Sequence, residues 1–478
     1  MTDRGTRTCL PHYPQSLSAL VPRHLLTAIC LGSLCCAASA GDDTLTGNWG
    51  GGLTRLTEIG VAYSVTYTGE VFGNPAGGVR RGTVCDGLLE ASLDFDLDKL
   101  AGWRGANFHA GALYPHGASG TERFVGDIGV FSNIDFSDST RLYEVWLEQG
   151  FFGDRIAVRM GQLDVDEDFA GSDFEQLFAS SNFGNSPALS NNVPESTYAV
   201  LALGLRLKLK PFAGFRASFA AYDGNPATAL GDPSPNAAAS TDFNRHNTHW
   251  TLRGDEGALL AGELGYTFNP TDDPASKPVS AEKNGWSKAI AFPRPLSGTY
   301  KAGLIHHSDT FSKVSDVQLG NLGSSLARAH PRGTRGDTVV YFVADQEVWR
   351  EPDSTGDGFG AFARVACGKA DRNFLNLAAE TGLVYRGLLQ DDAGDQLGLG
   401  CAFLEISDRV ADATRAANRR DETSFAVPNF EATIELTYQF KLTPSCAIQP
   451  DAQWILHPGG SHAIDDALVI GLRTTIAF

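Results

Sequence analysis

The feature that most constrains this chain is a two-residue alternation of apolar and polar side chains that recurs along most of its length. The plainest example runs from Leu201 to Lys210, where every second residue is leucine and the residues between them are mostly basic. Such alternation indicates a β-strand with one face in an apolar medium. A chain composed largely of these stretches is predicted to be all-β.

An acidic stretch indicates what surrounds these strands. From Leu89 to Asp98 the apolar residues alternate with one serine and four carboxylates. Burying such a face would be costly, so it must lie beside water. After residue 40 no apolar run approaches the roughly 18 residues that a transmembrane helix requires. If the chain crosses a membrane, its strands must close into a barrel, because lipid cannot satisfy an open sheet edge.

Sixteen alternating spans can be counted, and they predict a transmembrane antiparallel β-barrel of sixteen strands. Short connections alternate with long ones, as expected for periplasmic turns and extracellular loops. The connection 270–297 is the exception, because it is long where a turn is expected. The predicted spans are 61–72, 87–98, 106–115, 141–150, 155–163, 196–209, 215–223, 256–269, 298–307, 337–348, 359–367, 375–387, 396–406, 430–442, 446–457 and 465–478.

The N-terminus has the pattern of an export signal. Several arginines precede a short apolar core at 25–36 and the small residues Ala-Ser-Ala at 38–40, which is typical of a secretory signal with its cleavage site. We therefore expect a signal peptide at 1–40, a short periplasmic segment at 41–60 and an outer-membrane barrel at 61–478.

The C-terminal strand and the net charge indicate which partners the protein would have. The last strand ends on Phe478 and resembles the C-terminal strand that outer-membrane barrels present to the barrel-assembly machinery. Such a barrel would be surrounded by outer-membrane lipid and lipopolysaccharide. The formal net charge of −18 argues against nucleic-acid binding. No cofactor or metal motif is found in the sequence, and we expect neither group.

Several short motifs carry a resemblance to a known family. In order they are LTGNWGG (45–51), YTGEVFGNP (67–75), RLYEVWLEQ (141–149), RMGQ (159–162), ADQ (344–346) and HPGG (457–460). Their succession resembles the carbohydrate-selective porins of the OprB family from about residue 45 to the C-terminus. The resemblance implies a channel, not an enzyme, for passive diffusion of glucose and other small neutral sugars. The acidic stretch 163–168 departs from the family pattern and leaves the preferred sugar open.

The alternation also predicts which side chains face the lumen. It directs Glu144, Trp146 and Glu148 inward and Tyr143 outward, and the next strand directs Arg159 inward. Sugars offer C–H faces to aromatic rings and hydroxyls that donate and accept hydrogen bonds, so rings, carboxylates and guanidinium groups suit them together. The predicted pore-lining and sugar-binding residues are Glu70, Arg80, Arg81, Glu90, Asp94, Glu144, Trp146, Glu148, Arg159 and Arg206.

The connection 164–195 is the candidate constriction loop, by analogy with the inward-folded third loop of general porins. It begins with a group of carboxylates, Asp164, Asp166, Glu167 and Asp168. The alternative is a solvated surface loop.

Other functions remain open. A general or anion-preferring porin is the main alternative, because Arg206 and Lys208 favour anions whereas Glu90 and Asp94 oppose them. A barrel-borne enzyme is less favoured. Glu144 and Glu148, taken as a hydrolytic pair, would lie about 13 Å apart on one strand, too far for glycoside cleavage. A barrel plugged by side chains would not conduct, and the sequence does not separate a monomer from a homotrimer.

Overall fold

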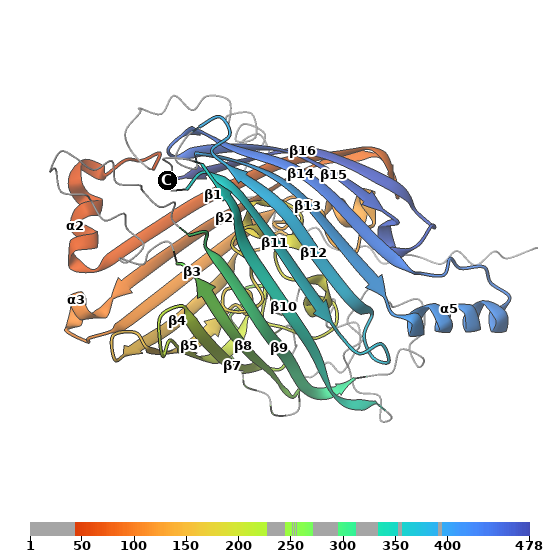
Figure 1. Cartoon of the computed structure of the whole chain (residues 1–478), viewed down its shortest axis with the longest axis horizontal. Helices are drawn as coiled ribbons and strands as arrows, with labels where there is room; N and C mark the ends of the chain where they lie inside the picture. Colours follow the sequence, from red (N-terminus) through yellow and green to blue (C-terminus); the bar gives the residue numbers. More distant parts are fainter. Residues whose placement is uncertain are drawn as a thin grey trace, which may run out of the picture. The chain divides into compact units, whose positions relative to one another are not determined.

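A closed β-barrel is the core of this protein (Figure 1). The computed structural model describes residues 44–226, 244–250, 252, 254, 256–270, 295–311, 333–351, 356–390 and 394–478. Consecutive strands are antiparallel neighbours, and β1 pairs with β16 to close the ring. The predicted sixteen-stranded antiparallel barrel is confirmed. The expected signal peptide at 1–40 and most of the connection 270–297 lie outside the described residues.

The strands differ considerably in length, from 8 residues in β5 and β6 to 18 in β1. Their bounds are β1 Val61–Gly78, β2 Gly82–Asp96, β3 Ala106–His116, β4 Arg141–Phe151, β5 Ile156–Leu163, β6 Ala202–Leu209, β7 Phe215–Asp223, β8 Ala258–Phe268, β9 Gly298–Phe311, β10 Thr334–Arg350, β11 Gly358–Cys367, β12 Leu375–Arg386, β13 Asp395–Ile406, β14 Phe430–Thr443, β15 Cys446–Leu456 and β16 Asp465–Ala477.

The first hairpin is longer than predicted. β1 and β2 continue through most of 73–86, which the sequence presents as a connection because Gly73, Asn74 and Pro75 commonly interrupt strands. The β1–β16 pairing is irregular between Gly73 and Ala76, so the position of Pro75 is accommodated by a bulge.

Two further strand boundaries differ from the predicted ones for local reasons. Asp96 accepts hydrogen bonds from the N–H groups of Asp98 and Lys99, and this N-cap starts α3 (Leu97–Ala101) where a strand was predicted to continue. β6 begins at Ala202, not at 196, because 196–201 belong to the long connection before it.

Helices lie at both ends of the barrel (Figure 1). α2 (Gly52–Ile59) and α3 lie at the end that holds Phe478, and α5 (Asp408–Asp421) lies at the opposite end. α5 was predicted as loop; its N-cap is Ser407, whose hydroxyl accepts from the N–H of Arg409. Shorter helical turns are η1 (Trp49–Gly51), η2 (Thr121–Val125), η3 (Glu175–Leu177), η4 (Ser181–Phe183), α4 (Pro187–Ser190) and η9 (Pro458–Gly460). Within the described ranges no helix is long and apolar enough to cross a membrane.

Apolar side chains occupy both faces of the wall, but for different reasons. On the outer face Leu205, Leu383 and Leu436 are each about half exposed, as expected for side chains that contact lipid. On the inner face Phe72 and Val343 are buried in clusters with residues of two long loops that fold into the lumen. The apolar core of the protein therefore lies inside the barrel, between the wall and these loops.

Candidate functional site

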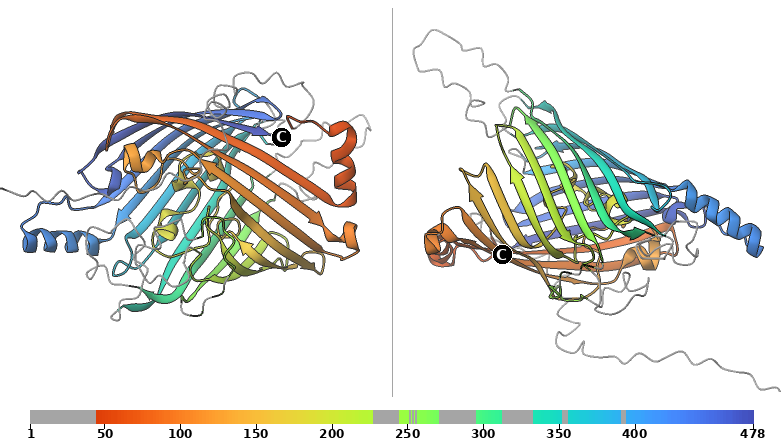
Figure 2. Two further views of the ribbon diagram at one scale, coloured as in Figure 1. Left: turned by 180° about the vertical axis from the view of Figure 1, so that it is seen from behind. Right: turned by 90° about the horizontal axis from the view of Figure 1, so that it is seen from below.

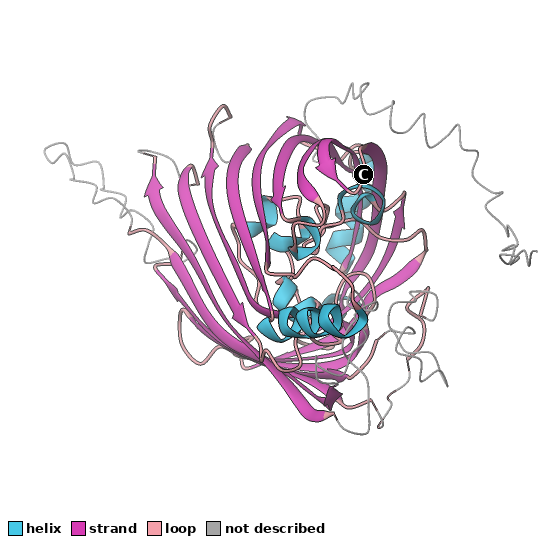
Figure 3. Ribbon diagram, turned by 90° about the vertical axis from the view of Figure 1, so that its right-hand side faces the viewer, coloured by secondary structure: helices cyan, strands magenta, loops and turns pink. Residues whose placement is uncertain are grey.

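Two long connections fill part of the lumen, as the views in Figures 2 and 3 show. We call them L2 (117–140, between β3 and β4) and L3 (164–201, between β5 and β6). Phe131 of L2 packs edge-on against the inward ring of Phe72 on β1. Phe178 and Phe183 of L3 pack on Phe362 of β11. L3 is therefore packed against the inner wall and is not a solvated surface loop.

Wall carboxylates hold the backbone of both loops. Glu435 of β14 accepts from the N–H groups of Ala179 (2.6 Å) and Ser180 (3.1 Å) in L3. Glu431, four residues earlier on the same face of β14, accepts from Gly129 of L2 (2.8 Å) and from Gly459 of the HPGG motif (2.9 Å). Carboxylates that accept backbone N–H groups form strong, charge-assisted bonds. Inward carboxylates were expected to lie beside water, and these two bind loop backbone instead.

Further carboxylates add to this arrangement on other strands. Glu263 of β8 accepts from the N–H of Ala170 at 2.9 Å, and Asp345 of β10 accepts from the hydroxyl of Ser172. Glu70 of β1 accepts from the hydroxyl of Ser132 and pairs with Arg473 at 2.9 Å. Glu70, predicted to line the pore, is therefore buried as an anchor of L2.

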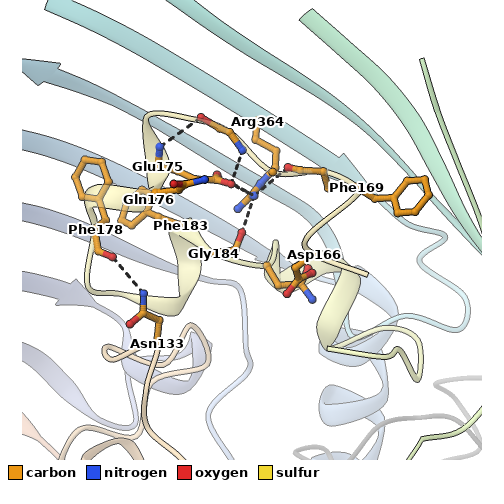
Figure 4. A pocket seen from close by; sticks show the side chains of 13 residues that line it. Asn133, Asp166, Phe169, Glu175, Gln176, Phe178, Phe183, Gly184 and Arg364 are labelled. Carbon is orange, nitrogen blue, oxygen red and sulfur yellow. Dashed lines mark hydrogen bonds and ion pairs between the residues drawn. The ribbon is translucent and has the colours of Figure 1, made fainter. Parts of the chain in front are cut away.

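Arg364 of β11 is a fully buried cation inside L3 (Figure 4). Its guanidinium donates to the carbonyls of Gly184 (2.7 Å) and Asn182 (3.0 Å) and pairs with Glu175 (2.8 Å) and Glu380 (3.3 Å). A buried charge is tolerated only when its donors are satisfied by partners of this kind. Arg364 thus ties the middle of L3 to β11 and β12.

A cavity of about 280 Å³ adjoins this tie, and we call it the loop pocket (Figure 4). Three phenylalanine rings, several amides, two carboxyl groups (Asp166 and Glu175) and the guanidinium of Arg364 surround it. The lining side chains include Asn133, Asp166, Phe169, Glu175, Gln176, Phe178, Phe183, Asn185 and Arg364. Apolar walls with a few convergent polar groups are typical of small-molecule sites.

The second site is built around Trp146 on β4, and we call it the Trp146 cluster. The imidazole of His109 on β3 stacks on the indole with ring centres 5.0 Å apart, and the guanidinium carbon of Arg159 on β5 lies 3.8 Å from the ring centre. β3 and β5 flank β4, so the two groups approach the ring from opposite sides. His109 also contacts Asp94 at 2.6 Å, and the indole N–H donates to Glu144 at 3.3 Å.

Ion pairs extend the cluster towards L3. Glu148 pairs with Arg159 (2.9 Å) and with Arg206 (2.7 Å), and Arg206 pairs in turn with Asp168 of L3 (3.0 Å). Lys208 lies 3.4 Å from the same Asp168. L3 therefore meets the wall of β4–β6 through a network of ion pairs, whereas on the other strands it is held by apolar contacts, backbone hydrogen bonds and the buried Arg364–Glu175 pair.

A bulge in β4 determines which side chains join this site. The β3–β4 register shifts between Ala110 and Ala112, so residues before and after the bulge share one face. The prediction that Tyr143 points outward is wrong for this reason: its hydroxyl donates to Asp164 of L3, and its ring packs inside. Glu144 and Trp146 point inward after the bulge.

A glycine permits the close approach of β5 to this bulge. Gly161 has φ +145°, and a Cβ there would lie 2.1 Å from the carbonyl oxygen of Val145. The RMGQ stretch thus has a geometric basis: Gly161, two residues after Arg159, lets β5 approach Trp146.

The acidic residues of L3 have different surroundings. Burial raises the pKa of Asp164 and of Asp166 well above the ordinary range; repulsion by Asp166 adds to the shift of Asp164, and repulsion by Glu195 adds to that of Asp166. Burial also raises the pKa of Glu195, which accepts from Asn185, to about 8. Glu167 is exposed next to Asp168, and the charges of Glu144 and Arg159 in the Trp146 cluster act on it.

The structure therefore brings together most, but not all, of the predicted residues. Glu144, Trp146, Glu148, Arg159 and Arg206 meet in one cluster with Asp94, Glu167 and Asp168. Glu90 is exposed on the inner face of β2. Arg80 and Arg81 lie apart from the cluster, in the β1–β2 turn, where Arg80 contacts Arg123 and Phe124 of L2.

His109 was missed, because its place opposite Trp146 depends on the β3–β4 register and not on its own strand. The wall anchors Glu431, Glu435 and Arg364 were missed as well. Their inward position fits the alternation of β11 and β14, but alternation gives no sign of what they bind.

Comparison with known proteins agrees with this architecture. Residues 81–478 match the family model described as "Carbohydrate-selective porin, OprB family". The chain belongs to the OprB family of carbohydrate-selective porins. Like other members, this OprB-family protein is an outer-membrane sugar porin, and its family is one of channels.

Individual relatives cover nearly the whole chain. Porin B of Pseudomonas aeruginosa is 26% identical over 480 residues, covering 95% of this chain and 96% of that protein. The "Putative porin QuiX" of Acinetobacter baylyi is 23% identical over 456 residues, covering 91% and 93%. The solved structure titled "High pH structure of Pseudomonas putida OprB" superposes with a TM-score of 0.75 at 22% identity, covering 92% of this chain and 99% of that one.

Proposed function

We propose that small neutral sugars, such as glucose, cross this porin by passive diffusion between L3 and the Trp146 cluster. The observation that carries the proposal is the charged cluster in which L3 meets β4–β6. It supplies carboxylates that accept from sugar hydroxyls and guanidinium groups that donate to them.

Cavities on both sides of the cluster support a path. The loop pocket, which includes Asp166, lies on the L3 side. A second cavity of about 260 Å³ is lined by Asp94, Trp146 and Glu148 together with Thr57 of α2 and Lys99 of α3. Because α2 and α3 lie at the end that holds Phe478, a sugar would pass from the loop pocket, past Glu167, to this end.

The proposal extends to location and assembly. The end that holds L2, L3 and α5 would face the exterior and the end with Phe478 the periplasm. The N–H of Phe478 donates to Val65 at 2.9 Å, so the chain end lies at the seam of the barrel. We expect residues 1–40 to be removed on export, the last strand to be read by the assembly machinery, and lipopolysaccharide to surround the outer rim. A homotrimer is one possible assembly.

Ion current through single channels in a planar bilayer tests the proposal. Glucose and maltose should each reduce the current of the wild-type channel in a saturable way. Arg159→Gln removes the guanidinium donor and leaves L3 in place, so it should weaken that block. Conducting channels that no sugar blocks would indicate a general porin, and an absence of conductance would indicate a plugged barrel.

A further inference from the structure

The cations of the Trp146 cluster are all engaged by carboxylates. Arg159 pairs with Glu148, Arg206 with both Glu148 and Asp168, and Lys208 with Asp168. Arg206 is fully buried between its partners. An ion pair presents little net charge to a passing solute, so these residues do not make the passage attractive to anions.

Two lumen-facing carboxylates differ from this pattern. Glu90 on β2 and Glu167 on L3 are both exposed, and within the described part of the chain neither lies within 4.0 Å of a cationic nitrogen. Burial and the nearby charges of Glu144 and Asp168 raise the pKa of Glu167, while Arg159 and His109 lower it. Asp94 adds a third carboxylate, with its side chain 52% exposed beside His109.

The charge balance along the passage is therefore negative. In the part of the passage next to Trp146 and Glu167, with His109 left out of the count, six carboxylates face three Lys and Arg side chains: Glu90, Asp94, Glu144, Glu148, Glu167 and Asp168 against Arg159, Arg206 and Lys208. A narrow passage with low-dielectric walls concentrates the field of such an excess. Carboxylates that line a pore are typical of paths for cations.

We propose, building on the sugar-porin function above, that this passage prefers sugars carrying a protonated amine over neutral sugars and disfavours sugar acids and sugar phosphates. Glu167 is the residue that sets the preference. It lies on L3 next to Asp168, which pairs with Arg206, and its side chain is exposed, so a solute passing the Trp146 cluster meets its carboxylate. An ammonium group donates charge-assisted hydrogen bonds to such an oxygen, while the rest of the sugar ring binds as a neutral sugar does.

Block of single-channel current at pH 6 tests this preference. The probes are glucose, N-acetylglucosamine, glucosamine and gluconate, each added in 0.1 M salt. Glucosamine should half-block at a concentration about fivefold below that of N-acetylglucosamine, the factor that one charge contact at about 4 Å in water supplies. Gluconate should block more weakly than glucose. The reversal potential in a salt gradient should show preference for cations.

Matched variants assign the effect to Glu167. Glu167→Gln should reduce the difference between glucosamine and N-acetylglucosamine to less than about twofold while glucose block persists. Glu422→Gln, an exposed carboxylate after α5, should leave both blocks unchanged. Glu90→Gln provides a second test if Glu167→Gln fails to assemble. Raising the salt to 1 M should also reduce the preference of the wild-type channel, because screening weakens contacts between exposed charges.

The outcomes separate this inference from the function on which it rests. Glucose block without any advantage for glucosamine would overturn the amino-sugar preference and leave the sugar porin standing. An advantage that survives both Glu167→Gln and Glu90→Gln would overturn the assignment to these carboxylates. A channel that no sugar blocks would overturn both proposals.

Discussion

The guanidinium carbon of Arg159 lies 3.8 Å from the centre of the Trp146 indole ring. With His109 stacked at 5.0 Å from the neighbouring strand on the other side, both faces of the ring are covered. A sugar therefore cannot stack on this tryptophan as the sequence suggested. On the proposed path a sugar would meet the edge of the indole and the outer edge of the guanidinium, so we expect Trp146 to act by positioning its charged partners.

This role predicts different effects for two substitutions of Trp146. Trp146→Phe keeps an aromatic face for Arg159 and should retain glucose block. Trp146→Ala removes that face, and loss of a cation–π contact of about 1.4 kcal/mol would weaken the block about tenfold. Titration of single-channel current with glucose measures both. Equal loss in the two variants would contradict a positioning role for the ring.

We predict that a side chain added at Gly161 prevents assembly of the barrel. Gly161→Ala places a Cβ 2.1 Å from the carbonyl oxygen of Val145 and forces alanine to a φ of +145°. We expect little folded protein in the outer membrane, as judged by heat-modifiable migration on gels. Gly184→Ala is the matched control, since its nearest contact would be an ordinary 3.6 Å to the oxygen of Ser181. Normal assembly of Gly161→Ala would show that β5 can move away from β4.

From the buried ion pairs of Arg364 we predict that L3 needs this residue to stay packed on the wall. Arg364→Met leaves Glu175 and Glu380 buried without their cation, which should cost about 3–5 kcal/mol of stability. Thermal unfolding in detergent should fall, and the channel should conduct more and with more noise as L3 loosens. Arg415→Met is the control, because the Arg415–Asp412 pair on α5 is more than half exposed and should contribute little.

A second substitution tests the same tie. Adding Glu380→Gln to Arg364→Met removes one of the two uncompensated charges and should recover part of the lost stability. If Arg364→Met alone leaves both stability and conductance unchanged, Arg364 does not anchor L3.

Much of the barrel could be predicted because lipid and water impose opposite demands on alternate residues. That rule located every strand, but it cut β1 and β2 short, began β6 too early, and failed where a local interaction overrode it. Asp96 started a helix by capping it, and the bulge opposite Gly111 reversed the face of Tyr143. The sequence of α5 does contain signals of a helix: Ser407 is its N-cap, and the buried residues Val410 and Thr414 are spaced four apart.

The interior could be predicted less well for a physical reason. Alternation assigns a side chain to the lumen but does not say whether water or a loop will meet it there. Glu90 faces water, whereas Glu435, inward by the same rule, accepts two backbone N–H groups of L3. These contacts join residues about 250 positions apart, and no local pattern in the sequence records them.

From the buried carboxyl of Glu195 in L3 we predict that the stability of the folded protein declines as the pH rises. Its carboxyl is buried beside Asn185 and near Asp164, and burial raises its pKa from the ordinary 4.5 to about 8. Between these two values the folded protein keeps a proton that the unfolded chain releases. The stabilisation is therefore complete below about pH 4.5 and is lost as the pH rises towards 8, a change on the order of a few kcal/mol. Asp164 and Asp166, whose pKa values are also raised, should act in the same direction.

Thermal unfolding in detergent between pH 5 and pH 9 measures this linkage, with Glu195→Gln beside the wild type. Glutamine keeps a polar group for Asn185 but cannot ionise, so the variant should lose less stability than the wild type across this range. Glu422→Gln, which is exposed, should follow the wild type. If Glu195→Gln is more stable than the wild type at pH 9 but not at pH 5, the result would agree with a protonated, buried Glu195. The same slope in all three proteins would show that Glu195 is ionised in the folded loop and that L3 admits water to it.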